Sequence, residues 1–210
     1  MPTVSRTTRR DEYAQATRQA ILVAARKLFA RRGYFATKVD EIAAKARVAP
    51  ATVYATMGGK YGLLTELVRI WTTDPIVETT TIHMVEMTDP IAIIRELAAG
   101  SRRMREQYED IMRVMLATAP HDRAVAGALN SATDVYRRAF VPVAERLLVL
   151  GALRRDLTIA DAVDRFWFYF GYTAYFTLHD DNGWSYERAE HWLAEQACRE
   201  LLSNPGTPAT

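Results

Sequence analysis

The chain has 210 residues, of which 49% are hydrophobic, and a formal net charge of +2. This length and composition allow one large domain or two modest ones with a sizeable core. They exclude an intramolecular disulfide, because Cys198 is the single cysteine of the sequence. The most apolar stretch, residues 166–176, is shorter than the roughly 18 residues of a membrane span, and the basic start does not lead into an apolar signal segment. We therefore expect a cytoplasmic protein that does not enter a membrane.

The charge is distributed unevenly along the chain. Residues 1–62 contain 12 Lys or Arg against 4 Asp or Glu, whereas the remainder contains 15 against 21. A basic first third followed by an acidic body is expected when only the first part meets a phosphate backbone. The alternative is a solvated basic surface that has no partner.

The first twelve residues lack regularly spaced apolar positions. They include Arg6, Arg9 and Arg10, so they indicate a flexible basic arm. Such an arm can lie in the minor groove of DNA, or it can be a solvated tail.

Residues 14–32 carry apolar side chains at helical spacing, which predicts a first long helix. Gly33 is placed to end this helix. Tyr34 and Phe35 are predicted to pack as aromatic plugs between this helix and the next.

Residues 37–60 predict two short helices that are joined by a tight turn. The first should begin near Lys38, where Thr37 and Asp40 have the spacing of a capping box, and it should end by Ala46. The second should begin at Pro50, whose fixed φ and missing N–H suit a first helical position. Its apolar residues fall on one side, so the opposite side is free to read a partner. These outward residues are Thr52, Tyr54 and Thr56.

The rest of the chain predicts further helices and no strand. The pairs Asp74-Pro75 and Asp89-Pro90 both resemble a helix cap followed by a first-turn proline. The expected helices span residues 60–73, 90–117, 122–150, 158–176 and 185–202. The helix that ends at residue 176 is apolar on nearly every face, which predicts that it is buried.

Residues 37–60 and the segment before them resemble the DNA-binding domain of the tetracycline-repressor (TetR) family of bacterial transcriptional regulators. The matching runs are Gly33-Tyr34-Phe35-Ala36-Thr37, Val39-Asp40-Glu41-Ile42-Ala43, Val48-Ala49-Pro50-Ala51-Thr52-Val53-Tyr54 and Gly59-Lys60. The resemblance implies an all-α fold in which a three-helix helix-turn-helix domain precedes a larger helical ligand-binding and dimerisation domain. The domain bounds that we expect are 1–12 for the arm, 13–59 for the helix-turn-helix domain, 60–203 for the helical body and 204–210 for a disordered tail.

The resemblance also implies which residues face double-stranded operator DNA. These are Lys38, Arg47, Pro50, Ala51, Thr52, Tyr54, Thr56 and Lys60. Thr52 and Tyr54 are the expected hydroxyl donors to base edges, and Lys60 could instead be a solvated surface lysine. Two positions depart from the family's usual pattern, because Arg47 stands where a glycine is common and Ala49 where a capping Ser or Thr is common.

The second domain resembles the family's C-terminal half less sharply. That half implies a homodimer formed through the last two helices and a pocket for a small molecule. Met and aromatic side chains make adaptable apolar cavities, so we expect an apolar or aromatic effector, while plain core packing is the alternative for each residue. The candidate pocket residues are Trp71, Met84, Met104, Tyr108, Met112, Met115, Tyr136, Phe140, Phe166 and Phe170.

Catalytic and metal-binding patterns are weak in this sequence. The histidines, His83, His121, His179 and His191, lack metal-ligand spacing, and no phosphate-binding glycine loop or nucleophile elbow is present. We therefore expect no enzyme activity, no cofactor and no metal. The favoured function is a ligand-responsive repressor, although no residue separates a repressor from an activator. The competing function is a helical small-molecule carrier or enzyme whose N-terminal hairpin only packs.

Overall fold

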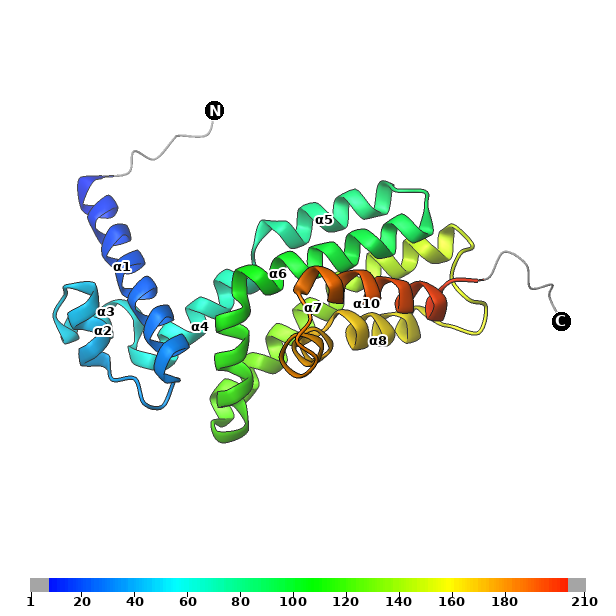
Figure 1. Cartoon of the computed structure of the whole chain (residues 1–210). Helices are drawn as coiled ribbons and strands as arrows, with labels where there is room; N and C mark the ends of the chain where they lie inside the picture. The colour runs from blue at the N-terminus through cyan, green and yellow to red at the C-terminus, as the bar shows by residue number, and fades with distance from the viewer. Residues whose placement is uncertain (1–7, 204–210) are drawn as a thin grey trace, which may run out of the picture. The chain divides into compact units, whose positions relative to one another are not determined.

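The computed structural model describes residues 8–203, and within them almost every segment is helical (Figure 1). The described residues contain no β-strand, and Leu153 and Leu202 form an isolated antiparallel bridge. The predicted all-α class is therefore confirmed. No helix in the described part of the chain is both long enough and apolar enough to cross a membrane.

The helices group into two compact units by their contacts. Of the described residues, the first unit contains 8–71 together with Asp110–Asn130, and the second contains Thr72–Glu109 together with 131–203. The first unit includes α1 (Arg9–Arg32), α2 (Val39–Ala46), α3 (Pro50–Met57) and α4 (Gly59–Thr72). Two long helices, α6 (Pro90–Thr118) and α7 (Arg123–Val149), contribute residues to both units. A domain boundary between residues 59 and 60 stays a prediction.

Helix α1 begins earlier than the sequence pattern predicts. The Thr8 hydroxyl accepts a hydrogen bond from the Asp11 backbone N–H at 3.3 Å, and the Asp11 carboxylate accepts one from the Thr8 N–H at 3.0 Å. This reciprocal cap starts the helix at Arg9, so the prediction of a flexible arm was wrong for residues 9–12, which are helical. Residues 1–7 of the predicted arm, which include Arg6, lie outside the described residues. The predicted end of the helix at Gly33 is confirmed, with a φ of 79°.

Helix α2 has the predicted bounds but a different cap. Lys38 is the capping residue, and its N–H donates to the Glu41 carboxylate at 3.1 Å. Thr37 is buried, and its hydroxyl donates to the Gly33 carbonyl oxygen at 2.8 Å. The prediction that Thr37 and Asp40 form the cap was therefore wrong by one position, because Thr37 closes the end of α1 instead.

The second unit contains the remaining helices. They are α5 (Pro75–Glu86), α8 (Ile159–Phe170), α9 (Tyr172–Phe176), the π-helical turn η2 (Thr177–Asp181) and α10 (Tyr186–Leu201), and the 3₁₀ turn η1 (Ala119–His121) separates α6 from α7. Asp74, Thr158 and Ser185 cap the helices that follow them, as their positions predict.

The predicted helix over residues 158–176 is interrupted at Gly171. A Cβ at this position would lie 2.2 Å from the Trp167 carbonyl oxygen, so the chain passes too close to α8 for any larger residue. The backbone turns there and restarts as α9. Phe168 is 71% exposed, so within one chain the helix is not buried on all faces as predicted.

Candidate DNA-binding surface and ligand pocket

Helix α3 has one packed side and one exposed side. Val53 and Met57 are buried in the first unit, whereas Tyr54 is 57% exposed. Pro50 and Ala51, at the start of the helix, are also exposed. Thr52 and Thr56 are half-buried. The structure therefore leaves Pro50, Ala51 and Tyr54 exposed and Thr52 and Thr56 only partly so, and their contact with DNA stays a prediction.

The turn before α3 depends on an arginine in the left-handed region. Arg47 has φ 59° and ψ 43°, and it is the single non-glycine residue with positive φ in the described chain. Its N–H donates to the Ala44 carbonyl oxygen at 3.2 Å, and the Val48 N–H donates to Ala43 at 3.0 Å, which closes the end of α2. As expected from the sequence, the side chain of Ala49 provides no cap for α3.

The predicted phosphate-binding cations differ in their surroundings. The Lys38 and Arg47 side chains are exposed. Lys60 is half-buried, and its Nζ donates to the Phe35 carbonyl oxygen at 3.3 Å and lies 4.6 Å from the centre of the Tyr34 ring. Burial lowers the pKa of Lys60 from its ordinary value. This lysine therefore closes the loop between α1 and α2, a role that the sequence did not indicate.

The two aromatic residues of that loop are not equivalent. Tyr34 is buried against Phe29 of α1, at 5.4 Å between ring centres, as predicted for an aromatic plug. Phe35 is 57% exposed, so the prediction that both rings pack inside was wrong for Phe35. Its ring contacts Tyr34 and His121 edge-on instead.

A polar cluster joins α3 to the helices on either side of it. Arg18 of α1 donates to the Thr56 carbonyl oxygen at 3.3 Å and pairs with the Glu66 carboxylate of α4 at 3.1 Å. Glu66 also accepts two hydrogen bonds from Arg69, each at 2.9 Å. The Arg69 guanidinium first, and Arg18 to a lesser extent, lower the pKa of Glu66 to about 2. Sequence reasoning missed this cluster, although the spacing of Glu66 and Arg69 on one helix was visible.

A second ion pair connects α1 with the C-terminal part of α6 inside the first unit. The Arg26 guanidinium donates to both carboxylate oxygens of Asp110, at 2.7 and 2.8 Å. This two-bond geometry fixes the relative position of the two side chains more strictly than a single contact would. The residues are 84 positions apart, so no local pattern could have revealed the pair.

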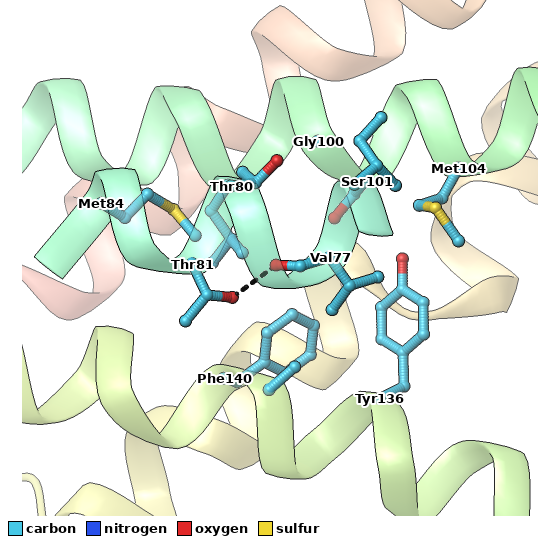
Figure 2. A pocket seen from close by; sticks show the side chains of 12 residues that line it. Val77, Thr80, Thr81, Met84, Gly100, Ser101, Met104, Tyr136 and Phe140 are labelled. Carbon is cyan, nitrogen blue, oxygen red and sulfur yellow. Dashed lines mark hydrogen bonds between the residues drawn. The ribbon is translucent and has the colours of Figure 1, made fainter. Parts of the chain in front are cut away.

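The second unit contains an apolar pocket between α5, α6 and α7 (Figure 2). The cavity volume is about 40 Å³, which is smaller than the roughly 300–1,000 Å³ of typical small-molecule sites, so a bound molecule would have to move the side chains that line it. The lining residues are Ile76, Val77, Thr80, Thr81, Met84, Leu97, Gly100, Ser101, Met104, Tyr136, Ala139 and Phe140.

The pocket brings together part of the predicted set. Met84, Met104, Tyr136 and Phe140 line it. The other six candidates are buried but do not line the pocket. Three of them belong to the first unit, namely Trp71, Met112 and Met115, and the other three are Tyr108, Phe166 and Phe170. The residues that sequence reasoning missed are mostly small, such as Thr80, Gly100 and Ser101. A cavity forms where side chains leave space, and a search for large apolar residues does not find such positions.

The short helix pair, with a packed inner face, an exposed second helix and basic side chains at the turn, has the geometry of a helix-turn-helix, an arrangement that many DNA-binding proteins use. Residues 21–67 match the family model described as bacterial regulatory proteins of the tetR family. The resemblance seen in the sequence is thus confirmed for these residues.

Solved structures of such regulators share the fold of the whole chain at low sequence identity. A TetR-family regulator from Syntrophomonas wolfei has a TM-score of 0.73 at 15% identity, over 87% of this chain and 93% of that one. SmeT in complex with triclosan has a TM-score of 0.74 at 18% identity, over 93% and 97% of the two chains. NalD, the secondary repressor of the MexAB-OprM multidrug efflux pump in Pseudomonas aeruginosa, has a TM-score of 0.70 at 21% identity, over 91% and 98%. No curated protein sequence matches the chain.

Proposed function

We propose that this chain is a homodimeric transcriptional repressor that leaves its operator when a small apolar or aromatic molecule occupies the pocket of the second unit. The observation that carries the proposal is the exposed face of α3, which is held by a packed inner face and flanked by basic residues. The family match over residues 21–67 supports it.

The composition of α3 determines how it would read DNA. The helix, PATVYATM, contains no charged residue, so base contacts would come from the Thr52 and Tyr54 hydroxyls and from apolar contact of Ala51 with a thymine methyl. The N-terminal end of the helix would face the phosphates with its free N–H groups. Lys38 and Arg47 would provide the exposed charges beside it. With so few base-reading groups, specificity would also rest on DNA shape.

A dimer is supported by apolar side chains that remain uncovered on the last helices. Helices α8 and α10 pack together, and each exposes a large aromatic residue, with Phe168 at 71% and Trp192 at 42% exposure. A second copy would cover this surface. It would also present two recognition helices to successive major grooves, which are about 34–36 Å apart.

Release by an effector is supported by the residues that α6 contributes to two different contacts. This helix carries Ser101 and Met104 in the pocket, and further along it carries Asp110, which pairs with Arg26 of α1. A ligand that favours one position of α6 would therefore favour one arrangement of the α1 contact. If that arrangement binds DNA less well, the ligand shifts the population away from the operator. SmeT has been solved with triclosan, so a protein of this fold accepts an aromatic molecule.

The test uses the full chain and the DNA upstream of its own gene. Fluorescence anisotropy should show binding that is stronger than to unrelated DNA of the same length and that weakens as salt rises. Tyr54→Phe, which removes one hydroxyl from the exposed face, should lose about 1 kcal/mol per half-site on the specific DNA only. Tyr169→Phe, the same change in the second unit, should bind like the wild type.

Equal affinity for upstream and unrelated DNA would overturn the regulator proposal. The chain would then be a helical small-molecule-binding protein or enzyme whose N-terminal hairpin only packs. A monomer in light scattering at the concentrations used for DNA binding would overturn the dimer separately.

A further inference from the structure

The second unit contains a buried cation without a carboxylate partner. Arg105, on α6 one turn after Ser101, is fully buried. Among the described residues no Asp or Glu lies within ion-pair distance of its guanidinium. Buried arginines are usually paired, because removing a charge from water without compensation is costly. An unpaired one therefore calls for an explanation.

The groups that surround Arg105 satisfy it only in part. Its Nη1 donates to the Tyr136 hydroxyl at 3.1 Å, and its Nη2 donates to the Phe170 carbonyl oxygen at 2.7 Å. The rings of Tyr136, Tyr172 and Tyr175 lie 5.4–5.6 Å from the guanidinium carbon, within the range of cation–π attraction. The Nε–H is buried and has no acceptor in the described part of the protein. All these partners are neutral, so the positive charge is not balanced.

Tyr136 connects this cation to the pocket. In Figure 2 its hydroxyl oxygen points from α7 toward Ser101 and Met104 on α6, inside the lining of the pocket. Because the oxygen accepts a hydrogen bond from Arg105, its own proton is available for donation. No acceptor for that proton occurs among residues 8–203. The pocket therefore contains a polarised hydroxyl donor with a positive charge directly behind it.

We propose that the pocket binds an amphipathic monocarboxylate, whose carboxylate accepts the Tyr136 proton and balances the Arg105 charge. Its apolar body lies against Met84 and Phe140. A single donor backed by a single charge fits a carboxylate better than a doubly charged phosphate. The proposal rests on the pocket being the effector site, and it replaces a purely apolar effector by an organic acid with an apolar body.

The experiment compares isosteric acids and amides on the full chain. The probes are 4-phenylbutanoate and 4-phenylbutanamide, together with straight-chain carboxylates and their amides, and calorimetry measures their affinities. The acid should bind at least about tenfold more tightly than its amide, as expected for a hydrogen bond to a charged group. Tyr136→Phe keeps the ring and removes the donor, so the preference should fall to about twofold or less. Tyr13→Phe makes the same change at an exposed position of α1 and should keep the full preference.

Three outcomes would overturn the proposal. They are equal affinity for acid and amide in the wild type, an unchanged preference in Tyr136→Phe, and the absence of binding by every acid of the series up to millimolar concentration. Thermal unfolding of Tyr136→Phe shows whether the variant is folded. DNA binding is measured separately, so a failure here leaves the regulator proposal standing, and a failure of DNA binding leaves the acid preference measurable.

Discussion

Replacing Arg47 by glycine should raise the stability of the protein and weaken its binding to DNA. Arg47 adopts φ 59° and ψ 43°, where its Cβ crowds the following carbonyl oxygen. This crowding costs about 1–2 kcal/mol for a residue other than glycine. Glycine removes it, but glycine also gains freedom in the unfolded chain, which offsets about 0.5–1 kcal/mol. We expect a net gain of about 0.5–1 kcal/mol in the free energy of unfolding.

The effect on DNA binding has the opposite sign. Arg47 is exposed beside the start of α3, and we expect it to contact a phosphate. Each phosphate contact that is lost reduces the slope of log K against log salt by about 0.9, so a dimer with two Arg47 side chains should lose about 1.8. Arg47→Lys keeps the charge and should retain most of the salt dependence of DNA binding. Arg47→Asn should relieve the backbone strain but should show the same reduced salt dependence as Arg47→Gly.

The two parts of this prediction are measured independently. Urea unfolding gives the stability, and anisotropy titrations over a series of salt concentrations give the slope. A less stable Arg47→Gly variant would show that the left-handed turn is not strained. An unchanged slope would show that Arg47 neutralises no phosphate and that the arginine has another reason to stand at this position.

Three further predictions concern the packing and ion pairs of the first unit. Gly62→Ala should lower the free energy of unfolding by about 1–3 kcal/mol, because the new Cβ would lie 1.7 Å from a carbonyl oxygen of α3. Gly127→Ala is the control, because no atom lies near its Cβ, and in the same urea unfolding assay it should raise that free energy by up to about 1 kcal/mol. The depressed pKa of Glu66 should make stability fall as the pH drops from about 4.5 toward about 2, by about 1–3 kcal/mol after solvent screening, and Glu66→Gln should lack this dependence. Asp110→Asn should lower the free energy of unfolding by about 1 kcal/mol, because it breaks the ion pair with Arg26. A double-mutant cycle with Arg26→Gln measures the coupling between the two side chains, and a coupling near zero would show that the ion pair does not contribute.

Helix boundaries were predictable where a local rule decides them. Pro50, Gly33 and the pair Thr158 and Asp161 all mark helix ends in the structure as their chemistry requires. The break at Gly171 was not predictable in the same way. The apolar pattern continues across it, and the reason for the break is a close approach of the backbone to α8.

The exposed face of α3 was predictable from the sequence because the helix is one contiguous motif. Every residue of α3 is fixed relative to the others by helical geometry, so spacing alone separates Val53 from Tyr54. Lys60 shows the limit of this reasoning. Whether its ammonium meets a phosphate or the Phe35 carbonyl oxygen depends on how the loop after α1 folds back, and no local pattern encodes that.

The pocket shows why a sequence reveals an apolar interior more easily than the chemistry inside it. Met and aromatic residues indicated a cavity, but Arg105 was hidden among the many charged residues of an amphipathic helix. Its burial is partly compensated by the break after α8, because the Phe170 carbonyl oxygen lies at the end of that helix and accepts a hydrogen bond from Arg105 at 2.7 Å. The same interruption at Gly171 therefore ends the helix and supplies the acceptor for the cation behind Tyr136. A Gly171→Ala variant should thus change acid binding as well as stability, whereas loss of stability alone would show that the break serves packing only.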